Sequence, residues 1–200
     1  MKKLFTYLFL ITNLIFFYPN FAISKVVGDK IILGSAISLT GKYSLKGIDI
    51  QKGFNLAMDN INKGGGIKVG EKNYNFQIVY YDDESSAIRA AQIAKRLILQ
   101  EGIQFILGPY SVELTKAMMS ITEKNRVLIV EINNIAPSPI TRGYEYIFSV
   151  DVLKNSIKES ANALLVYKEA IESANSFDIS KIREAFDLII QNRNYLLDMT

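Results

Sequence analysis

The chain of 200 residues contains no cysteine, no histidine and no tryptophan. Without cysteine there is no disulfide, no thiolate metal site and no cysteine nucleophile. Without histidine there is no Ser-His-Asp triad and no zinc bound by imidazole. General acid–base catalysis would fall to carboxylates, lysines or tyrosines, and no nucleophile with an evident base stands out. We therefore expect a protein that is not an enzyme and that holds no cofactor or metal.

An excess of charge of one sign is also missing. The 23 Lys and Arg residues nearly balance the 20 Asp and Glu residues, and two of the positive charges, Lys2 and Lys3, lie in a segment that we expect to be removed. A chain so close to neutrality has no electrostatic footprint for nucleic acid. With 49% hydrophobic and 22% charged residues, the composition is typical of a folded globular protein, and the length favours one domain.

Residues 1–24 have the pattern of a secretory signal peptide. Two lysines are followed by a mostly apolar run over residues 4–17, and Ala22 and Ser24 put small residues three and one positions before Lys25. A membrane anchor is the alternative, but the run is shorter than the roughly 20 residues that span a bilayer. We expect cleavage after Ser24 and a soluble mature protein in the periplasm.

Strand-like and helix-like segments alternate between residues 31 and 132. Apolar and β-branched runs predict strands at 31–37, 74–81, 103–107 and 127–132, and helical spacing of apolar residues predicts helices around 50–61, after Ser85 as N-cap, and at 114–124. This alternation predicts a parallel sheet. Two more helices are expected at 157–174 and 178–192, the second capped by Asp178, and both should cover apolar surface of the same domain.

The loops after the predicted strands are the candidate sites, because ligands of an open parallel sheet bind beyond the carboxyl ends of its strands. Ser111 and the N–H groups of the helix that follows it can hold an anion such as a carboxylate. The alternative is that Ser111 only caps that helix. Asp82, Asp83 and Glu84 have the ligand type of a Mg²⁺ site, but charge compensation at a helix start explains them better. Residues 64–66, three glycines, lack the Lys-Ser/Thr of a phosphate loop.

Short motifs follow one another in a recognisable order. They read Ser-Leu-Thr-Gly at 38–41, Ala-Met-Asp-Asn-Ile-Asn at 57–62, Tyr-Asp-Asp-Glu at 81–84, Leu-Gly-Pro-Tyr-Ser at 107–111 and Arg-Gly-Tyr at 142–144. The ordered set resembles the periplasmic leucine/isoleucine/valine-binding protein family, the type I solute receptors of ABC importers. It covers about residues 31–148, and residues 161–186 resemble the helical stretch near the family's C-terminus. The resemblance implies an α/β fold with a doubly wound parallel sheet, one lobe of a type I periplasmic-binding-protein fold plus two C-terminal helices.

The resemblance also implies a departure from the family. Its members have two lobes that close on a ligand, whereas this chain runs from the first lobe directly to the late helices, with the junction somewhere in residues 151–160. We therefore expect most of the second lobe to be absent. The expected organisation is a signal peptide at 1–24, an N-terminal ligand-binding lobe at 25–150 and a helical segment at 151–200.

The resemblance carries several ligand-binding residues onto this chain. Tyr110 and Ser111 match the loop whose hydroxyl and amide groups hold the ligand carboxylate in the family. Asn133 and Asn134 fall in the loop that supplies further contacts. Lys46 sits where an aromatic side chain often packs on the ligand.

Three further positions lie near these residues in the sequence. Tyr43 lies close to the end of the first strand, where a phenol can stack on a ligand or donate to it. Val112 stands where serine is usual in the family and Glu113 where glycine is usual. Glu113 is expected to set a negative charge against a ligand carboxylate.

Three functional hypotheses follow. The first is a substrate-binding component of an ABC importer for branched-chain or related amino acids, working with a membrane permease. Its binding would be millimolar or weaker, because a single wall leaves a small ligand largely in water. The second is a degenerate or incomplete fragment without binding activity. The third is a small exported α/β enzyme or signalling domain built on Asp82 and Asp83, against which the signal peptide and the missing catalytic set both count.

Overall fold

The computed structural model describes residues 25–132, 143–149 and 156–197. Three expected features lie outside the described residues: the signal peptide at 1–24, the part of the junction region up to residue 155, and the candidate residues Asn133 and Asn134.

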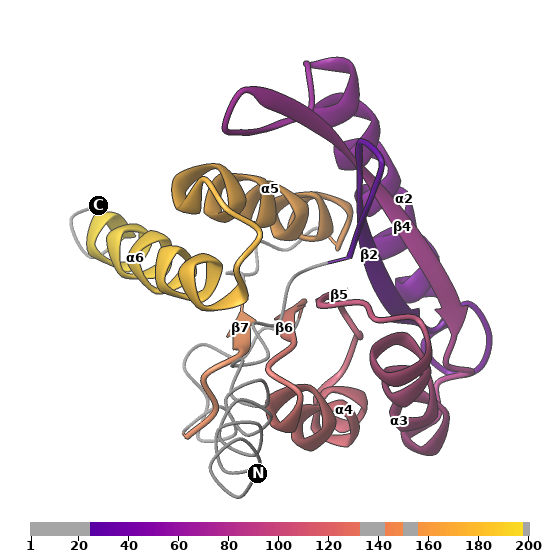
Figure 1. Ribbon diagram of the computed structural model, residues 1–200. Coiled ribbons are helices and arrows are strands. Elements are labelled where there is room, and N and C mark those ends of the chain that lie inside the picture. The colour runs from indigo at the N-terminus through magenta and orange to yellow at the C-terminus, as the bar shows by residue number, and fades with distance from the viewer. Residues whose placement is uncertain (1–24, 133–142, 150–155, 198–200) are drawn as a thin grey trace, which may run out of the picture.

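A mostly parallel sheet forms the centre of the molecule (Figure 1). Its strand order is β3-β4-β2-β5-β6-β7, with β1 paired to β2 beside this path. The four strands predicted from the sequence run parallel to one another, as expected, and β7 adds a fifth parallel strand. The bounds are β1 Val26–Val27, β2 Lys30–Ile37, β3 Ile67–Val69, β4 Lys72–Asp82, β5 Phe105–Leu107, β6 Leu128–Glu131 and β7 Ile147–Ser149.

Helices cover both faces of the sheet, so the doubly wound α/β fold is confirmed (Figure 1). One face packs against α2, α5 and α6, and the other against α3, the π-helical turn η1 that continues α3, and α4. The bounds are α2 Ser44–Lys63, α3 Ala87–Lys95, η1 Arg96–Gln100, α4 Val112–Lys124, α5 Ser156–Ala174 and α6 Ile179–Leu197. No helix among the residues described is both long and apolar enough to cross a membrane.

The central strands are apolar along most of their length because both faces of the sheet are buried. Successive side chains of a strand point to opposite faces, so Ile31, Leu33 and Ile37 of β2 join the core under α2 and α5, while Ile32 and Ala36 join the core under α3 and α4. With no face left for water, a central parallel strand reads as a continuous apolar run. This is why the strand signal in the sequence was clear.

The two late helices are part of the same core as the sheet, which confirms that expectation. Residues of α5 and α6 pack in one cluster with residues of α2, β2, β5 and β6. The buried hydroxyl of Tyr167 in α5 lies 2.9 Å from the carbonyl oxygen of Ile106 and 2.8 Å from that of Leu128, and donates its proton between them. Asp178 caps α6 as predicted, since its carboxylate accepts from the N–H groups of Ser180 and Lys181.

Some elements differ from the expectation. Strands β1, β3 and β7 are two or three residues long, too short to leave a periodic pattern in the sequence. The prediction that Ser85 caps the second helix is wrong: Ser86 is the N-cap, and its hydroxyl accepts from Arg89 N–H. Glu84 and Ser85 have φ of 55° and 57°, a left-handed conformation that keeps the helix from starting there. The first turn of α3 contains no acid, so charge compensation at that helix start was also a wrong reading of the acidic run.

Candidate functional site

Loops after three neighbouring strands meet at the carboxyl edge of the sheet. The first ligand loop, residues 38–43, follows β2; the acidic loop, residues 83–86, follows β4; and the loop of residues 108–111 follows β5. Because β2 pairs with both β4 and β5, its loop lies between the other two. The loop after β6 lies for the most part outside the described residues.

Two aromatic rings and an ion pair join the first ligand loop to the region after β5. The rings of Tyr43 and Tyr110 meet edge to face, with centroids 5.6 Å apart. The Lys42 ammonium lies 3.0 Å from a carboxylate oxygen of Glu113 and 4.7 Å from the centre of the Tyr43 ring. The hydrogen bond that Lys42 donates to the Glu113 carboxylate raises the pKa of Lys42. These contacts bring together loops whose residues lie about seventy positions apart in sequence.

Ser111 has a strained backbone and caps α4. Its φ of 97° and ψ of 142° lie in a region that residues other than glycine rarely occupy, and such residues concentrate at binding sites. Its hydroxyl oxygen accepts from the N–H of Leu114 at 3.3 Å. The capping role is therefore present. Capping uses the hydroxyl oxygen as an acceptor, whereas holding a carboxylate would use the hydroxyl proton.

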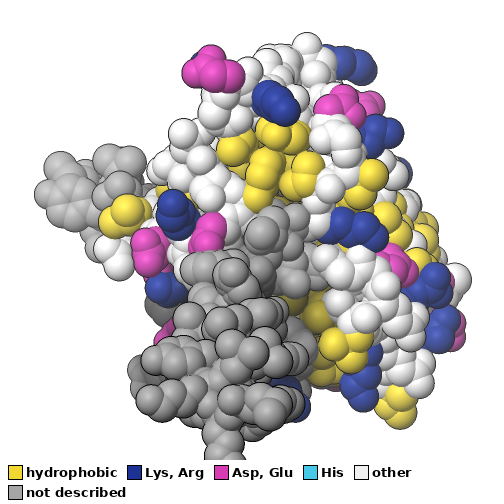
Figure 2. All heavy atoms as spheres, in the orientation of Figure 1, with side chains coloured by type: hydrophobic (Ala, Val, Ile, Leu, Met, Phe, Trp, Pro, Cys, Tyr) yellow, Lys and Arg dark blue, Asp and Glu magenta, His cyan; other side chains and the backbone are white. Residues whose placement is uncertain are grey.

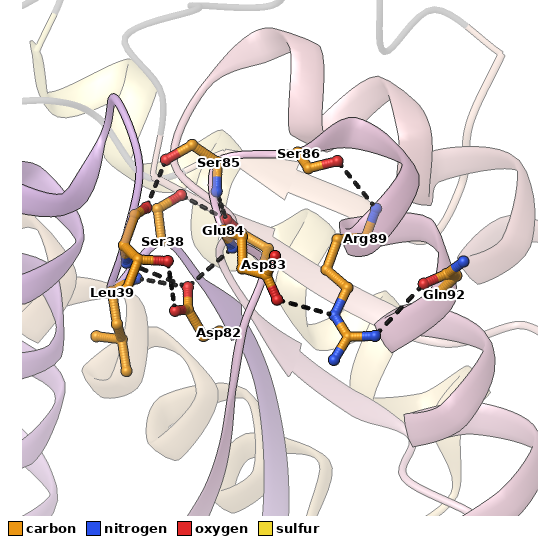
Figure 3. A network of polar contacts seen from close by, with 10 residues as sticks. Ser38, Leu39, Asp82, Asp83, Glu84, Ser85, Ser86, Arg89 and Gln92 are labelled. Carbon is orange, nitrogen blue, oxygen red and sulfur yellow. Dashed lines mark hydrogen bonds and ion pairs between the residues drawn. The ribbon is translucent and has the colours of Figure 1, made fainter.

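The carboxylate of Asp82 binds the first ligand loop (Figure 3). One oxygen accepts from the N–H groups of Leu39 at 2.9 Å and Thr40 at 3.3 Å, and the other accepts from the Thr40 hydroxyl at 2.8 Å. The N–H of Glu84 also donates to it. Partial burial works to raise the pKa of Asp82, but these hydrogen bonds outweigh it and hold the pKa below its usual range.

Asp83 is fully buried behind the same loop (Figure 3). Its Oδ1 accepts from the Ser38 hydroxyl at 2.6 Å and from the N–H of Ser85 at 2.8 Å, while its Oδ2 has no hydrogen-bond partner. Burial raises the pKa of Asp83 above its usual range, and the charges of Asp82 and Glu84 act in the same direction against the two hydrogen bonds. Two adjacent carboxylates thus have pKa values shifted in opposite directions.

The acidic run is not arranged as a cation site. The oxygens of Asp82 face N–H and hydroxyl donors, and Asp83 is enclosed by protein. Within the described ranges, no group of three or more acidic, histidine or cysteine side chains is placed to hold a metal ion.

A sequence model of the family described as periplasmic binding protein matches residues 30–160. The match runs from β2 into α5 and includes the three loops described above. The chain belongs to this family. The resemblance read from the sequence is thereby confirmed.

Curated relatives of this periplasmic binding protein are named for branched-chain amino acids. It is 30% identical to Leu/Ile/Val-binding protein homolog 8 of Brucella abortus (strain 2308), and the 133 matched residues are 66% of this chain and 32% of that protein. It is 28% identical over 136 residues to the leucine-, isoleucine-, valine-, threonine-, and alanine-binding protein of Pseudomonas aeruginosa, which is 68% of this chain and 35% of that protein. The chain therefore spans about a third of the length of the curated relatives it matches.

Solved structures agree with this assignment. The branched-chain amino acid transporter substrate binding protein LivJ from Streptococcus pneumoniae, in complex with isoleucine, superimposes with a TM-score of 0.55 and 27% identity over 60% of this chain and 33% of that chain. A solute binding protein of an ABC transporter from R. palustris, in complex with 4-hydroxybenzoate, gives a TM-score of 0.52 over 82% of this chain and 44% of that chain. At 20% identity, the second match shows a likeness of fold alone.

The structure brings some of the predicted site residues of this periplasmic binding protein together. Tyr43 and Tyr110 touch, and Ser111 adjoins Tyr110 at the start of α4. Lys46 is exposed in the first turn of α2, three residues beyond Tyr43. Glu113 does not present an uncompensated charge as expected, because Lys42 pairs with it.

Sequence reasoning missed Lys42 and the role of the acidic loop. Lys42 is an ordinary exposed lysine whose partner lies in the first turn of α4, so no local pattern could reveal the pairing. The acidic run is visible in the sequence, but neighbouring residues alone indicate a helix start rather than a contact with residues more than forty positions away. Figure 2 shows basic and acidic side chains interspersed over the face in view, which agrees with the nearly balanced charge of the sequence.

Proposed function

We propose that this chain is a substrate-binding component of an ABC importer for branched-chain or related amino acids, and that it acts by binding rather than catalysis. The signal peptide would direct export to the periplasm and be cleaved after Ser24, and the partner would be the membrane permease of the importer. The observation that carries the proposal is the family match over residues 30–160, together with relatives named for leucine, isoleucine and valine binding.

The geometry of the carboxyl edge supports a ligand site there. Ligands of open parallel sheets bind beyond the carboxyl ends of the strands, where this chain places Tyr43, Tyr110 and Ser111. The first amide groups of α4 have no partner within the helix, so they suit a ligand carboxylate, and Ser111 adds a hydroxyl. We propose Tyr43, Lys46, Tyr110, Ser111, Asn133 and Asn134 as the ligand-binding residues.

We propose that the affinity of this chain by itself is millimolar or weaker. The described residues supply one wall, and hydrogen bonds to charged groups contribute roughly 1.5–3 kcal/mol each when water is excluded. Losing two or three such bonds weakens binding by several powers of ten, at about 1.4 kcal/mol per factor of ten. A degenerate chain without binding is the second candidate, because the carboxylate of Glu113 lies in the first turn of α4, beside the N–H groups proposed for a ligand carboxylate.

Titration of the purified mature chain with L-leucine, L-isoleucine and L-valine tests the proposal. Calorimetry would detect micromolar binding, and NMR shift titration reaches millimolar affinities. Saturable shifts at Tyr43, Tyr110 and Ser111 in the millimolar range are expected. Micromolar affinity would contradict the single-wall argument, and absence of any saturable shift would favour the degenerate chain.

A further inference from the structure

We infer that Ser85 and Asp82 are positioning residues for ligand binding: they hold the first ligand loop in the conformation that places the Tyr43 ring against Tyr110. The part of this inference that concerns ligand affinity rests on the proposed function, whereas the part that concerns loop conformation does not.

The Ser85 hydroxyl bridges the middle and the end of the first ligand loop. It donates to the carbonyl oxygen of Thr40 at 2.8 Å and accepts from the N–H of Tyr43 at 3.0 Å. One hydroxyl group therefore uses both its proton and a lone pair on the same neighbouring loop. Since Tyr43 is the last residue before α2, fixing its N–H fixes where the aromatic side chain leaves the backbone.

The Asp82 carboxylate holds the beginning of the same loop. It accepts from the N–H groups of Leu39 and Thr40 and from the Thr40 hydroxyl, as Figure 3 shows for Leu39. Hydrogen bonds to an ionised acceptor are about twice as strong as neutral ones. Residues 39–43 are thus bound near both ends by side chains at the end of β4 and in the acidic loop that follows it.

The backbones of the two loops approach closely enough to require glycine. Gly41 has φ of +78°, and a Cβ on it would lie 2.7 Å from the carbonyl oxygen of Glu84 and 2.8 Å from the Ser85 hydroxyl. Glu84 and Ser85 themselves keep left-handed φ values, which persist where surrounding contacts over-determine them. The contact is therefore a close fit of two loops and not a single hydrogen bond.

These contacts place the ring of Tyr43 against the ring of Tyr110 at the carboxyl edge of the sheet. The edge-to-face contact at 5.6 Å links the first ligand loop to the loop after β5. If Ser85 and Asp82 act through Tyr43, they affect a ligand at this edge without touching it.

Amide hydrogen exchange of the folded, full mature chain tests the conformational part. Ser85→Ala and, separately, Asp82→Asn should speed exchange of residues 39–43 by about tenfold or more, and by a larger factor than they speed exchange in β5 and β6. The nuclear Overhauser contacts between the rings of Tyr43 and Tyr110 should weaken. Glu84→Gln is the matched control, because the Glu84 side chain lies in the same loop as Ser85 but points to Arg89, with which it forms an ion pair. Unchanged exchange in Ser85→Ala, or equal effects in Glu84→Gln, would overturn the inference.

A double-mutant cycle with L-leucine tests the route through Tyr43. Ser85→Ala should weaken leucine binding by roughly three- to tenfold, because the first ligand loop loses the two hydrogen bonds that the Ser85 hydroxyl makes with it. In a Tyr43→Ala background the same change should have no further effect. Equal weakening in both backgrounds would show that Ser85 does not act through Tyr43. If the wild-type chain binds no leucine, the proposed function fails, while the exchange experiment still decides whether the loop is held in this way.

Discussion

Asp82 and Asp83 show how neighbours in sequence acquire opposite electrostatic roles. Asp82 points to a loop whose N–H and hydroxyl groups stabilise its charge, whereas Asp83 points into the protein and leaves one oxygen without a partner. Alternation of side chains along an extended strand end sends consecutive residues to different surroundings. Identical chemistry therefore produces pKa shifts of opposite direction.

Replacement of Asp83 by Asn should raise the free energy of unfolding at neutral pH. The amide oxygen of Asn can still accept from Ser38 and Ser85, while the cost of burying a charge disappears. Because the pKa of Asp83 is raised in the folded state, the ionised form is disfavoured there. The stability of the wild type relative to Asp83→Asn should therefore fall as pH rises from about 4, the usual Asp value, through the raised pKa.

Urea unfolding of the wild type and Asp83→Asn at a series of pH values measures this difference in the free energy of unfolding. Asp82→Asn is the comparison variant, because the carboxyl group of Asp82 has the opposite pKa shift. The pKa of Asp82 is lowered by folding, so its charge stabilises the folded chain above the usual Asp pKa, and that stabilisation is lost as pH falls through the lowered value. Asp82→Asn should therefore destabilise at neutral pH and approach the wild type in acid. Parallel pH profiles for the two variants would contradict both assignments.

At the scale of the elements, α2 and α5 cross closely, and a glycine allows the crossing. A Cβ on Gly53 would lie 2.0 Å from the Ser160 hydroxyl and 2.2 Å from the carbonyl oxygen of Ile157. The second of these atoms belongs to the backbone and cannot rotate away. The position of α5 over the sheet thus depends on a residue in the middle of α2.

Gly53→Ala should lower the free energy of unfolding, although alanine is the better helix former. Overpacking costs about 1–3 kcal/mol or more, and the gain in helix propensity of about 1 kcal/mol offsets only part of it. Gly64→Ala is the matched control: Gly64 ends α2 with φ of −77°, and its Cβ would meet nothing nearer than 3.1 Å. Thermal unfolding of both variants decides the matter, and a Gly53→Ala chain as stable as Gly64→Ala would refute the close crossing.

Tyr167 links α5 to two neighbouring strands through one hydroxyl. It is fully buried, and its oxygen lies within hydrogen-bond distance of carbonyls in β5 and β6. Tyr167→Phe should cost about 1–3 kcal/mol in chemical denaturation, because buried acceptors lose their donor. Tyr80→Phe, whose hydroxyl donates to the exposed amide of Asn55, should have a much smaller effect. Equal losses in the two variants would show that the buried hydroxyl has no special part in docking α5.

The elements that could be predicted from the sequence are those whose signal is local. Burial on both faces makes β2, β5 and β6 continuous apolar runs, and Asp178 caps α6 through N–H groups two and three residues away. The features that were missed depend on pairs distant in sequence: Lys42 with Glu113, Asp82 with Leu39 and Thr40, and Gly53 with Ile157. The sequence around either partner contains no pattern that indicates such a pair. The site could therefore be located at a sheet edge, but its internal contacts could not be predicted.

At the scale of the whole molecule, one face of the sheet depends on the two late helices. Eight large side chains of α5 and α6 are buried in the core that they share with β2, β5 and β6: Leu164, Val166, Tyr167, Ile171, Ile179, Ile182, Phe186 and Ile189. Phe186 stacks on Phe148 of β7 with ring centroids 4.6 Å apart and meets the ring of Tyr167 edge to face. The helices are therefore part of the fold's core rather than an appendage to a finished lobe.

A chain that stops after Ser149 should fail to fold cooperatively. Burial of a large apolar side chain contributes about 1.5–3 kcal/mol, so eight of them contribute at most roughly 12–24 kcal/mol, compared with a net stability of about 5–15 kcal/mol for a typical domain. The bare sheet face would also expose Phe105, Leu128 and Val130 to water, which favours aggregation. Circular dichroism during heating, with the full mature chain as reference, should show a broad transition or none for the shortened chain. A sharp transition with native near-ultraviolet signal would mean that residues 25–149 form a self-sufficient lobe and that α5 and α6 add little to its stability.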